Sequence, residues 1–116
     1  MTEIQSDMNN LDIFKKANKV LGEGNYEEFI TYCSEDIQWE NVGEHTFHGK
    51  AELIEYVKST YDGVVFTTDK YITEKDVVVE LGQIVFEKNG VPKMSSFCDV
   101  WKFKDGLIHQ VTSFVI

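Results

Sequence analysis

The chain has 116 residues, a usual length for one domain and enough to bury a core without disulfides or metal ions. Its 42% hydrophobic content and single proline are typical of an ordered globular protein. The formal charge of −9 disfavours nucleic acids and acidic membrane surfaces, and the eleven lysines form no basic stripe. We therefore expect one domain, residues 1–116, that binds neither nucleic acid nor membrane.

The cellular location follows from two further features. No apolar segment approaches the roughly 20 residues that span a bilayer, and residues 1–10 lack the basic and apolar regions of a signal peptide. Cys33 and Cys98 have no metal-ligand spacing, so we expect two reduced, partly buried thiols. These features predict a cytoplasmic protein.

Two helices are predicted near the N-terminus. After a short polar lead, Asn10 can cap the first, and Gly22 would end it. Its apolar residues recur every three or four positions, at Leu11, Phe14, Ala17, Val20 and Leu21. Asn25 is expected to cap a second, shorter helix, with Glu28 in the capping-box position and residues 34–36 ending it.

A strand, a loop and a third helix follow. The strand is predicted at Ile37–Val42, with Trp39 on one face and Glu40 on the other, and the pattern does not say which face is inside. The loop carries a brief extended piece at residues 45–47, and Gly49 begins a helix that runs to about residue 61. Such a passage places polar groups at the rim of a core, which is a common location for a site.

The second half of the chain predicts four long strands. β-Branched and aromatic residues dominate it, and Asn89-Gly90 and Asp105-Gly106 are strong hairpin signals, with residues 74–76 as a further tight turn. The strands are predicted at Val64–Glu74, Val77–Lys88, Val91–Lys104 and Leu107–Ile116. Strands of this length are expected to curl, so that helices closing the concave side would enclose an apolar pocket.

This order of elements resembles the nuclear transport factor two-like superfamily, especially its SnoaL-like and ketosteroid-isomerase-like members. The resemblance covers nearly the whole chain and is carried by the order and spacing of Gly24-Asn25-Tyr26, residues 32–40, 47–51 with Ile54, and 96–103 with Asp105-Gly106. It implies one SnoaL-like domain of the α+β class. The expected fold is a cone-shaped half-barrel, in which a curved mixed or antiparallel sheet of cystatin-like topology wraps around three N-terminal helices.

The resemblance also implies an activity. In ketosteroid isomerase a general-base aspartate ends the first strand and a protonated aspartate precedes the last hairpin turn; Glu40 and Asp99 hold these places here. The tyrosine that completes the pattern falls at Lys16 or its neighbours, so the catalytic set is incomplete. The implied function is cofactor-independent isomerase, cyclase or hydratase chemistry, by proton transfer on an apolar carbonyl compound. Ligand binding without chemistry and a protein-interaction module are the alternatives.

The two carboxylates also stand out by their strand positions. By alternation Asp99 shares a face with Phe97, Trp101 and Phe103, where shielding from water would raise its pKa. The alternative is an exposed face or a structural hydrogen bond to a backbone amide. Glu40 follows Trp39 and would lie at the pocket rim or face solvent. If the two converge, they form an acid–base pair.

The remaining candidates are histidines and aromatic residues. His45 and His48 lie on a loop without fixed geometry, so no metal site is expected, and either could carry protons in the pocket or simply lie at the helix entry. Tyr32 and Tyr56 could replace the missing tyrosine donor. The predicted ligand-binding residues are Tyr32, Trp39, His48, Tyr56, Phe97 and Trp101.

One predicted strand is apolar on both faces. Residues 77–88 place Val77, Val79, Leu81 and Val85 on one face, and Val78, Ile84 and Phe86 on the other. Because helices can cover only one face, a second subunit is expected to cover the other. We therefore predict a homodimer that forms through the sheet.

Overall fold

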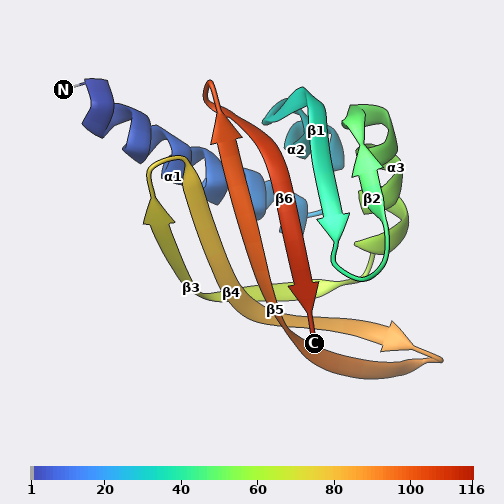
Figure 1. The fold of residues 1–116 in the computed structure, drawn as a ribbon. Helices are drawn as coiled ribbons and strands as arrows, with labels where there is room; N and C mark the ends of the chain where they lie inside the picture. Colours follow the sequence, from blue (N-terminus) through green and yellow to red (C-terminus); the bar gives the residue numbers. More distant parts are fainter. Residues whose placement is uncertain (1) are drawn as a thin grey trace.

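A computed structural model describes residues 2–116, with side chains from Asn10 onward. Three helices precede most of the sheet (Figure 1). The elements are α1 (Thr2–Gly22), α2 (Tyr26–Thr31), β1 (Cys33–Asn41), β2 (Thr46–His48), α3 (Gly49–Thr60), β3 (Val65–Glu74), β4 (Val77–Lys88), β5 (Val91–Lys104) and β6 (Leu107–Val115). The predicted strands of the second half are confirmed to within one residue at each end.

All six strands form one sheet in the order β2-β1-β6-β5-β4-β3. Neighbours are antiparallel except β1 and β6, which run parallel, so the sheet is mixed. The hairpin turns at residues 89–90 and 105–106 have positive φ at both positions, as two-residue turns between twisted strands require. The predicted α+β half-barrel is confirmed.

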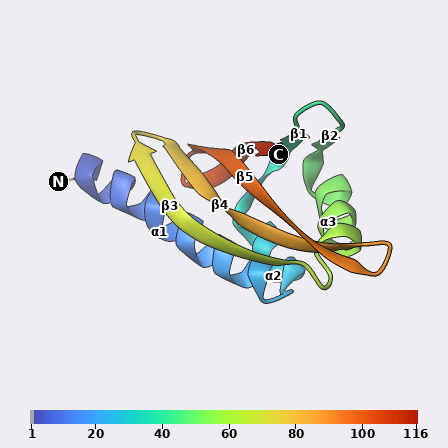
Figure 2. The same ribbon diagram turned by 90° about the horizontal axis from the view of Figure 1, so that it is seen from below.

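The helices cover the concave face. Helix α1 crosses beneath β3, β4 and β6, while α3 packs on β1 and β2 beside the bent end of the β4–β5 hairpin (Figure 2). The core between these layers is largely aromatic and aliphatic, with Phe14, Phe29, Ile37, Trp39, Leu53, Val57, Trp101 and Val111 fully buried. This arrangement leaves the space between α3 and the bent hairpin for a cavity.

Two predictions near the N-terminus are wrong. Asn10 does not cap α1 but lies inside it, buried, and its Nδ2 donates to Oδ1 of Asp76 at 3.3 Å. Residues 34–36 do not end α2, because β1 already begins at Cys33. The pairing of β1 with β6 is irregular between Cys33 and Gln38, which explains why this segment lacks simple strand alternation. The Asn25 cap is confirmed, since its side chain accepts from the backbone N–H of Glu28.

A glycine allows the sheet to bend. A Cβ atom on Gly82 would lie 2.1 Å from the carbonyl oxygen of Thr67 and 2.8 Å from the ring of Phe97. The β3–β4 pairing is irregular at the same level, between Thr68 and Lys70. Glycine therefore lets β3 and the Phe97 ring approach the β4 backbone closely.

No helix in the described part of the chain is long and apolar enough to cross a membrane. The cytoplasmic location stays a prediction from the sequence.

Candidate functional site

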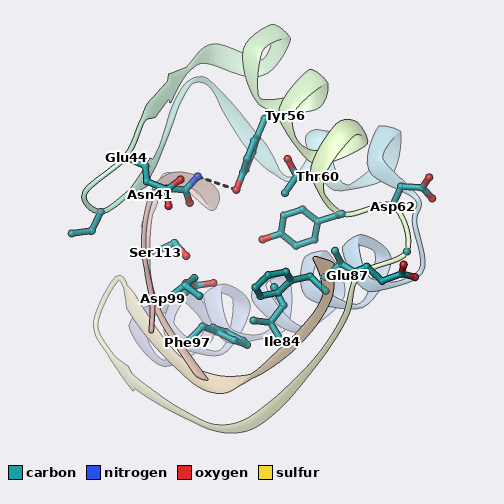
Figure 3. A pocket seen from close by; sticks show the side chains of 16 residues that line it. Asn41, Glu44, Tyr56, Thr60, Asp62, Ile84, Glu87, Phe97, Asp99 and Ser113 are labelled. Carbon is teal, nitrogen blue, oxygen red and sulfur yellow. Dashed lines mark hydrogen bonds between the residues drawn. The ribbon is translucent and has the colours of Figure 1, made fainter. Parts of the chain in front are cut away.

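A cavity of about 460 Å³ opens between α3 and the bent ends of β4, β5 and β6 (Figure 3). This volume suits a small organic molecule. Apolar side chains form much of its wall, and a few polar groups point inward. The lining residues are Asn41, Val42, Glu44, Tyr56, Thr60, Tyr61, Asp62, Gly63, Val64, Ile84, Phe86, Glu87, Phe97, Asp99, Ser113 and Val115.

Asp99 is the most deeply buried carboxyl group of the cavity wall. It lies on β5, where it pairs with Glu80 on β4 and with Ser113 on β6. Paired residues share a face of a sheet, so all three side chains lie on the concave side. Asp99 is only 6% exposed, and its Oδ1 atom has no hydrogen-bond partner among the described residues. A buried carboxylate oxygen without a partner is unfavourable for folding and available to a ligand.

Burial raises the pKa of Asp99 from 3.8 to about 7. A hydrogen bond from Ser113 opposes this increase, and the charge of Glu80 adds to it. The carboxyl group is therefore divided between its protonated and ionised forms near neutral pH. A group with this pKa can both accept and return a proton at the pH of the cell.

Glu80 is buried as well, but its oxygens are satisfied. Its Oε2 accepts from Thr68 Oγ1 at 2.6 Å and from Asn18 Nδ2 at 3.1 Å, and its Oε1 accepts from Trp101 Nε1 at 3.2 Å. Burial raises its pKa, and these three hydrogen bonds oppose the increase. Glu80 thus connects α1 to the sheet and is already committed to protein partners.

Tyr56 faces the cavity from α3, opposite the Asp99 wall (Figure 3). The indole Nε1 of Trp39 donates to Oδ1 of Asn41 at 3.0 Å, and Nδ2 of Asn41 donates to the Tyr56 hydroxyl at 2.9 Å. Because an indole N–H can only donate, Trp39 fixes the orientation of the Asn41 amide. The Tyr56 oxygen is thereby an acceptor within the protein, and its own proton remains available to a ligand.

The family model for the SnoaL-like domain matches residues 14–111. The chain belongs to the SnoaL-like domain family. The comparison of this chain with curated proteins finds no match.

Solved structures share the fold at low sequence identity. Bal32a from a soil-derived mobile gene cassette has a TM-score of 0.85 at 14% identity, covering 95% of this chain and 91% of its own. An LEH-like epoxide hydrolase of M. tuberculosis has a TM-score of 0.82 at 13% identity, with coverages of 95% and 84%. A nuclear transport factor two-like protein of unknown function from Cytophaga hutchinsonii has a TM-score of 0.78 at 22% identity, with coverages of 90% and 97%. At these identities the similarity supports the fold alone.

The SnoaL-like domain does not bring Glu40 and Asp99 together. Trp39 is buried in the core, so by strand alternation Glu40 points to the opposite face of β1 and does not line the cavity. The condition for an acid–base pair of these two carboxylates, that both reach one cavity, is therefore not met. The inward position next to Trp39 belongs to Asn41, which lines the cavity.

The six predicted ligand-binding residues divide into two groups. Tyr56 and Phe97 line the cavity. Trp39 and Trp101 are buried in the core behind it, 1% exposed each. Tyr32 and His48 also lie outside the lining: the Tyr32 hydroxyl donates to Oε2 of Glu28 at 3.3 Å, and His48 precedes α3 with an exposed side chain. Tyr32, Trp39, His48 and Trp101 thus do not line this cavity, and their role in ligand binding stays a prediction.

Sequence reasoning missed Asn41, Tyr61 and Ser113 as site residues. The signal for Asn41 was present, because it lies two positions after an inward tryptophan. Ser113 could be found only from its pairing with Asp99 across β5 and β6. Tyr61 follows α3, and burial raises the pKa of its hydroxyl well above 10, with the charge of Asp99 contributing. Among the described side chains, no three His, Cys, Asp or Glu residues gather as a metal-binding group.

Proposed function

We propose that the SnoaL-like domain is a cofactor-independent enzyme that moves a proton on an apolar carbonyl compound, in the manner of an isomerase, cyclase or hydratase. One observation carries the proposal: Asp99, with a pKa of about 7 and one buried oxygen without a partner among the described residues, lines a cavity of about 460 Å³. The shared fold with an LEH-like epoxide hydrolase is compatible with catalysis in such a cavity but says nothing of the substrate.

The proposed reaction uses two residues of the cavity wall. Ionised Asp99 takes a proton from the carbon next to the carbonyl group. The electron pair of the broken C–H bond forms a C=C bond, and the π pair of the carbonyl group moves to its oxygen. The Tyr56 hydroxyl, held by Asn41, donates a hydrogen bond to the oxygen as its charge develops. Asp99 then returns the proton to a second carbon. In this scheme Asp99 is both the base and the acid, whereas the sequence analysis assigned the base to Glu40 and the acid to Asp99.

Proton transfer can be tested before the substrate is known. A panel of apolar ketones, including 4-phenylcyclohexanone, is incubated with the protein in D₂O, and exchange of the protons beside the carbonyl is followed by NMR. We expect exchange above the buffer rate for at least one ketone. Asp99→Asn should slow it by about 100-fold or more, because a positioned proton carrier contributes about that much. Tyr56→Phe should slow it by about tenfold or more.

Two variants serve as matched controls for this experiment. Glu40→Gln and Tyr32→Phe make the same chemical changes outside the cavity and should leave exchange unaltered. Exchange that survives Asp99→Asn but is lost in Glu40→Gln would overturn the assignment. Binding of a ketone without any exchange would favour the non-catalytic ligand-binding alternative.

We also propose a homodimer that forms through the outer face of the sheet. Leu81, Cys98 and Phe114 pair across β4, β5 and β6 and so form one row on that face. Leu81 and Phe114 are 37% and 43% exposed. The helices cover only the opposite face, so a second copy of the same row is the proposed cover.

A further inference from the structure

The entrance to the cavity is acidic. Glu44 of the β1–β2 loop lines one side of the cavity, and Asp62 of the α3–β3 turn and Glu87 of β4 line the opposite side, with their carboxylates turned outward (Figure 3). All three residues are exposed. None of the sixteen lining residues is Lys, Arg or His. No ion pair among the described side chains involves any of the three carboxylates. Their charge is therefore not neutralised by a neighbour and acts on whatever enters the cavity.

The wall beneath the entrance is aromatic. Rings of Tyr56, Tyr61, Phe86 and Phe97 line the cavity together with Ile84. The face of an aromatic ring attracts a cation, and it does so more strongly where water is excluded. The same rings provide apolar contact for the rest of a ligand. Acidic rim and aromatic wall thus favour the same kind of molecule.

Asp99 gives independent evidence that this space receives a ligand. The residue lines the cavity and is only 6% exposed, and its buried Oδ1 atom has no hydrogen-bond partner among the described residues. A ligand with a hydrogen-bond donor, or with an acidic C–H bond, would satisfy that atom, whereas an anionic ligand group would add a second negative charge beside it.

We infer that the cavity selects ligands with a protonated amine on an apolar body. The negative charge of Glu44, Asp62 and Glu87 around the cavity attracts the ammonium group, and the apolar body lies against the aromatic wall and reaches Asp99. This inference rests on the proposed function, because it places the substrate in the same cavity. It adds that the substrate carries a positive charge. Carboxylates, phosphates and coenzyme A esters are disfavoured.

Three probes with one apolar body test the inference by NMR-detected binding. They are 4-phenylcyclohexylamine, 4-phenylcyclohexanone and 4-phenylcyclohexanecarboxylate. We expect the amine to bind at least about tenfold more tightly than the ketone, and the carboxylate to bind most weakly. Because exposed charges are screened by salt, the advantage of the amine should shrink on raising the salt concentration from about 0.02 to 0.5 M. Equal affinities of amine and ketone at low salt would overturn the inference.

Variants of the three acidic residues test whether they cause the preference for the amine. Glu44→Gln, Asp62→Asn and Glu87→Gln should each weaken amine binding by about two- to fivefold and leave ketone binding unchanged, as expected for exposed charges. Glu74→Gln removes the same charge at the far end of β3 and should have no effect on either probe. An amine preference that survives in the triple rim variant would also overturn the inference.

The experiments distinguish a failure of the proposed proton transfer from a failure of the proposed charge selection. Ketone exchange that is absent while the amine preference persists contradicts proton transfer alone. Exchange that depends on Asp99 while the amine preference is absent contradicts the charge selection alone.

Discussion

Two buried carboxylates face each other on neighbouring strands, and their hydrogen bonding separates their roles. Glu80 accepts three hydrogen bonds from protein donors, which holds α1 on the sheet. Asp99 keeps one oxygen without a partner and faces the cavity. The same carboxyl chemistry thus gives a structural anchor at Glu80 and, on the next strand, the proton carrier that we propose at Asp99.

The pKa of Asp99 predicts a pH dependence of stability. The folded state keeps the Asp99 proton up to about pH 7, whereas the unfolded chain releases it near 3.8. The folded state therefore binds more protons between these values, so its stability falls as pH rises through this window and is lowest above pH 7. The full effect is at most about 4 kcal/mol.

Asp99→Asn removes this titration while keeping the shape of the side chain. Urea unfolding at pH 5 and pH 8 should show that the parent loses stability over this interval relative to the variant. The variant should be the more stable of the two at pH 8. Parallel behaviour of both proteins across the interval would show that Asp99 titrates at its ordinary pKa.

At the level of elements, β4 determines the shape of the cavity. Its inward residues Ile84 and Phe86 form part of the wall, and Gly82 lets the Phe97 ring of β5 lie against the strand. Bending at this level positions the end of the β4–β5 hairpin near α3 (Figure 2). A side chain on Gly82 would therefore disturb both stability and the site.

Gly82→Ala is expected to lower the free energy of unfolding by about 3 kcal/mol or more, because the added methyl group overlaps a backbone oxygen and an aromatic ring. It should also weaken binding of a ketone probe by displacing Phe97. Thermal unfolding and NMR binding measure the two effects. Gly22→Ala is the matched control, since its Cβ would lie 3.4 Å from Phe66, in ordinary contact, and stability should change little. Similar melting temperatures for both variants would contradict this explanation.

The elements were more predictable than the site. Turn pairs such as Asn89-Gly90 fix strand ends through local backbone requirements, so the sequence places β3 to β6 well. Asp99 was found because a carboxylate alternates with aromatic residues on one strand. Glu40 was misplaced because the alternation pattern of β1 does not say which face is buried, and the parallel pairing with β6 that decides this joins distant segments. The Asn41–Tyr56 contact depends on the same long-range pairing.

At the scale of the molecule, the helices cover one face of the sheet, and the opposite face carries an apolar row. The outer row of Leu81, Cys98 and Phe114 predicts a dimer. Light scattering during gel filtration should give about twice the chain mass of 13.4 kDa for the parent. Leu81→Asp combined with Phe114→Asp should give the monomer mass, because burying two carboxylates in an apolar interface is unfavourable.

Leu107→Asp is the control for this experiment. Leu107 is 38% exposed but lies at the opposite end of β6 from Phe114, so its substitution should leave the mass unchanged. A monomeric parent protein would show that the outer face is uncovered in solution.

The parallel pairing of β1 with β6 also has a consequence for how the protein folds. Asn41 pairs with Ser113, so one wall of the cavity is built from segments about 70 residues apart in the chain. Such contacts form late, because the entropy of closing a long loop must be overcome before they become favourable. We therefore expect the helices and the β4–β5 hairpin to gain structure first. The cavity would then close in the last step, when β1 docks on β6.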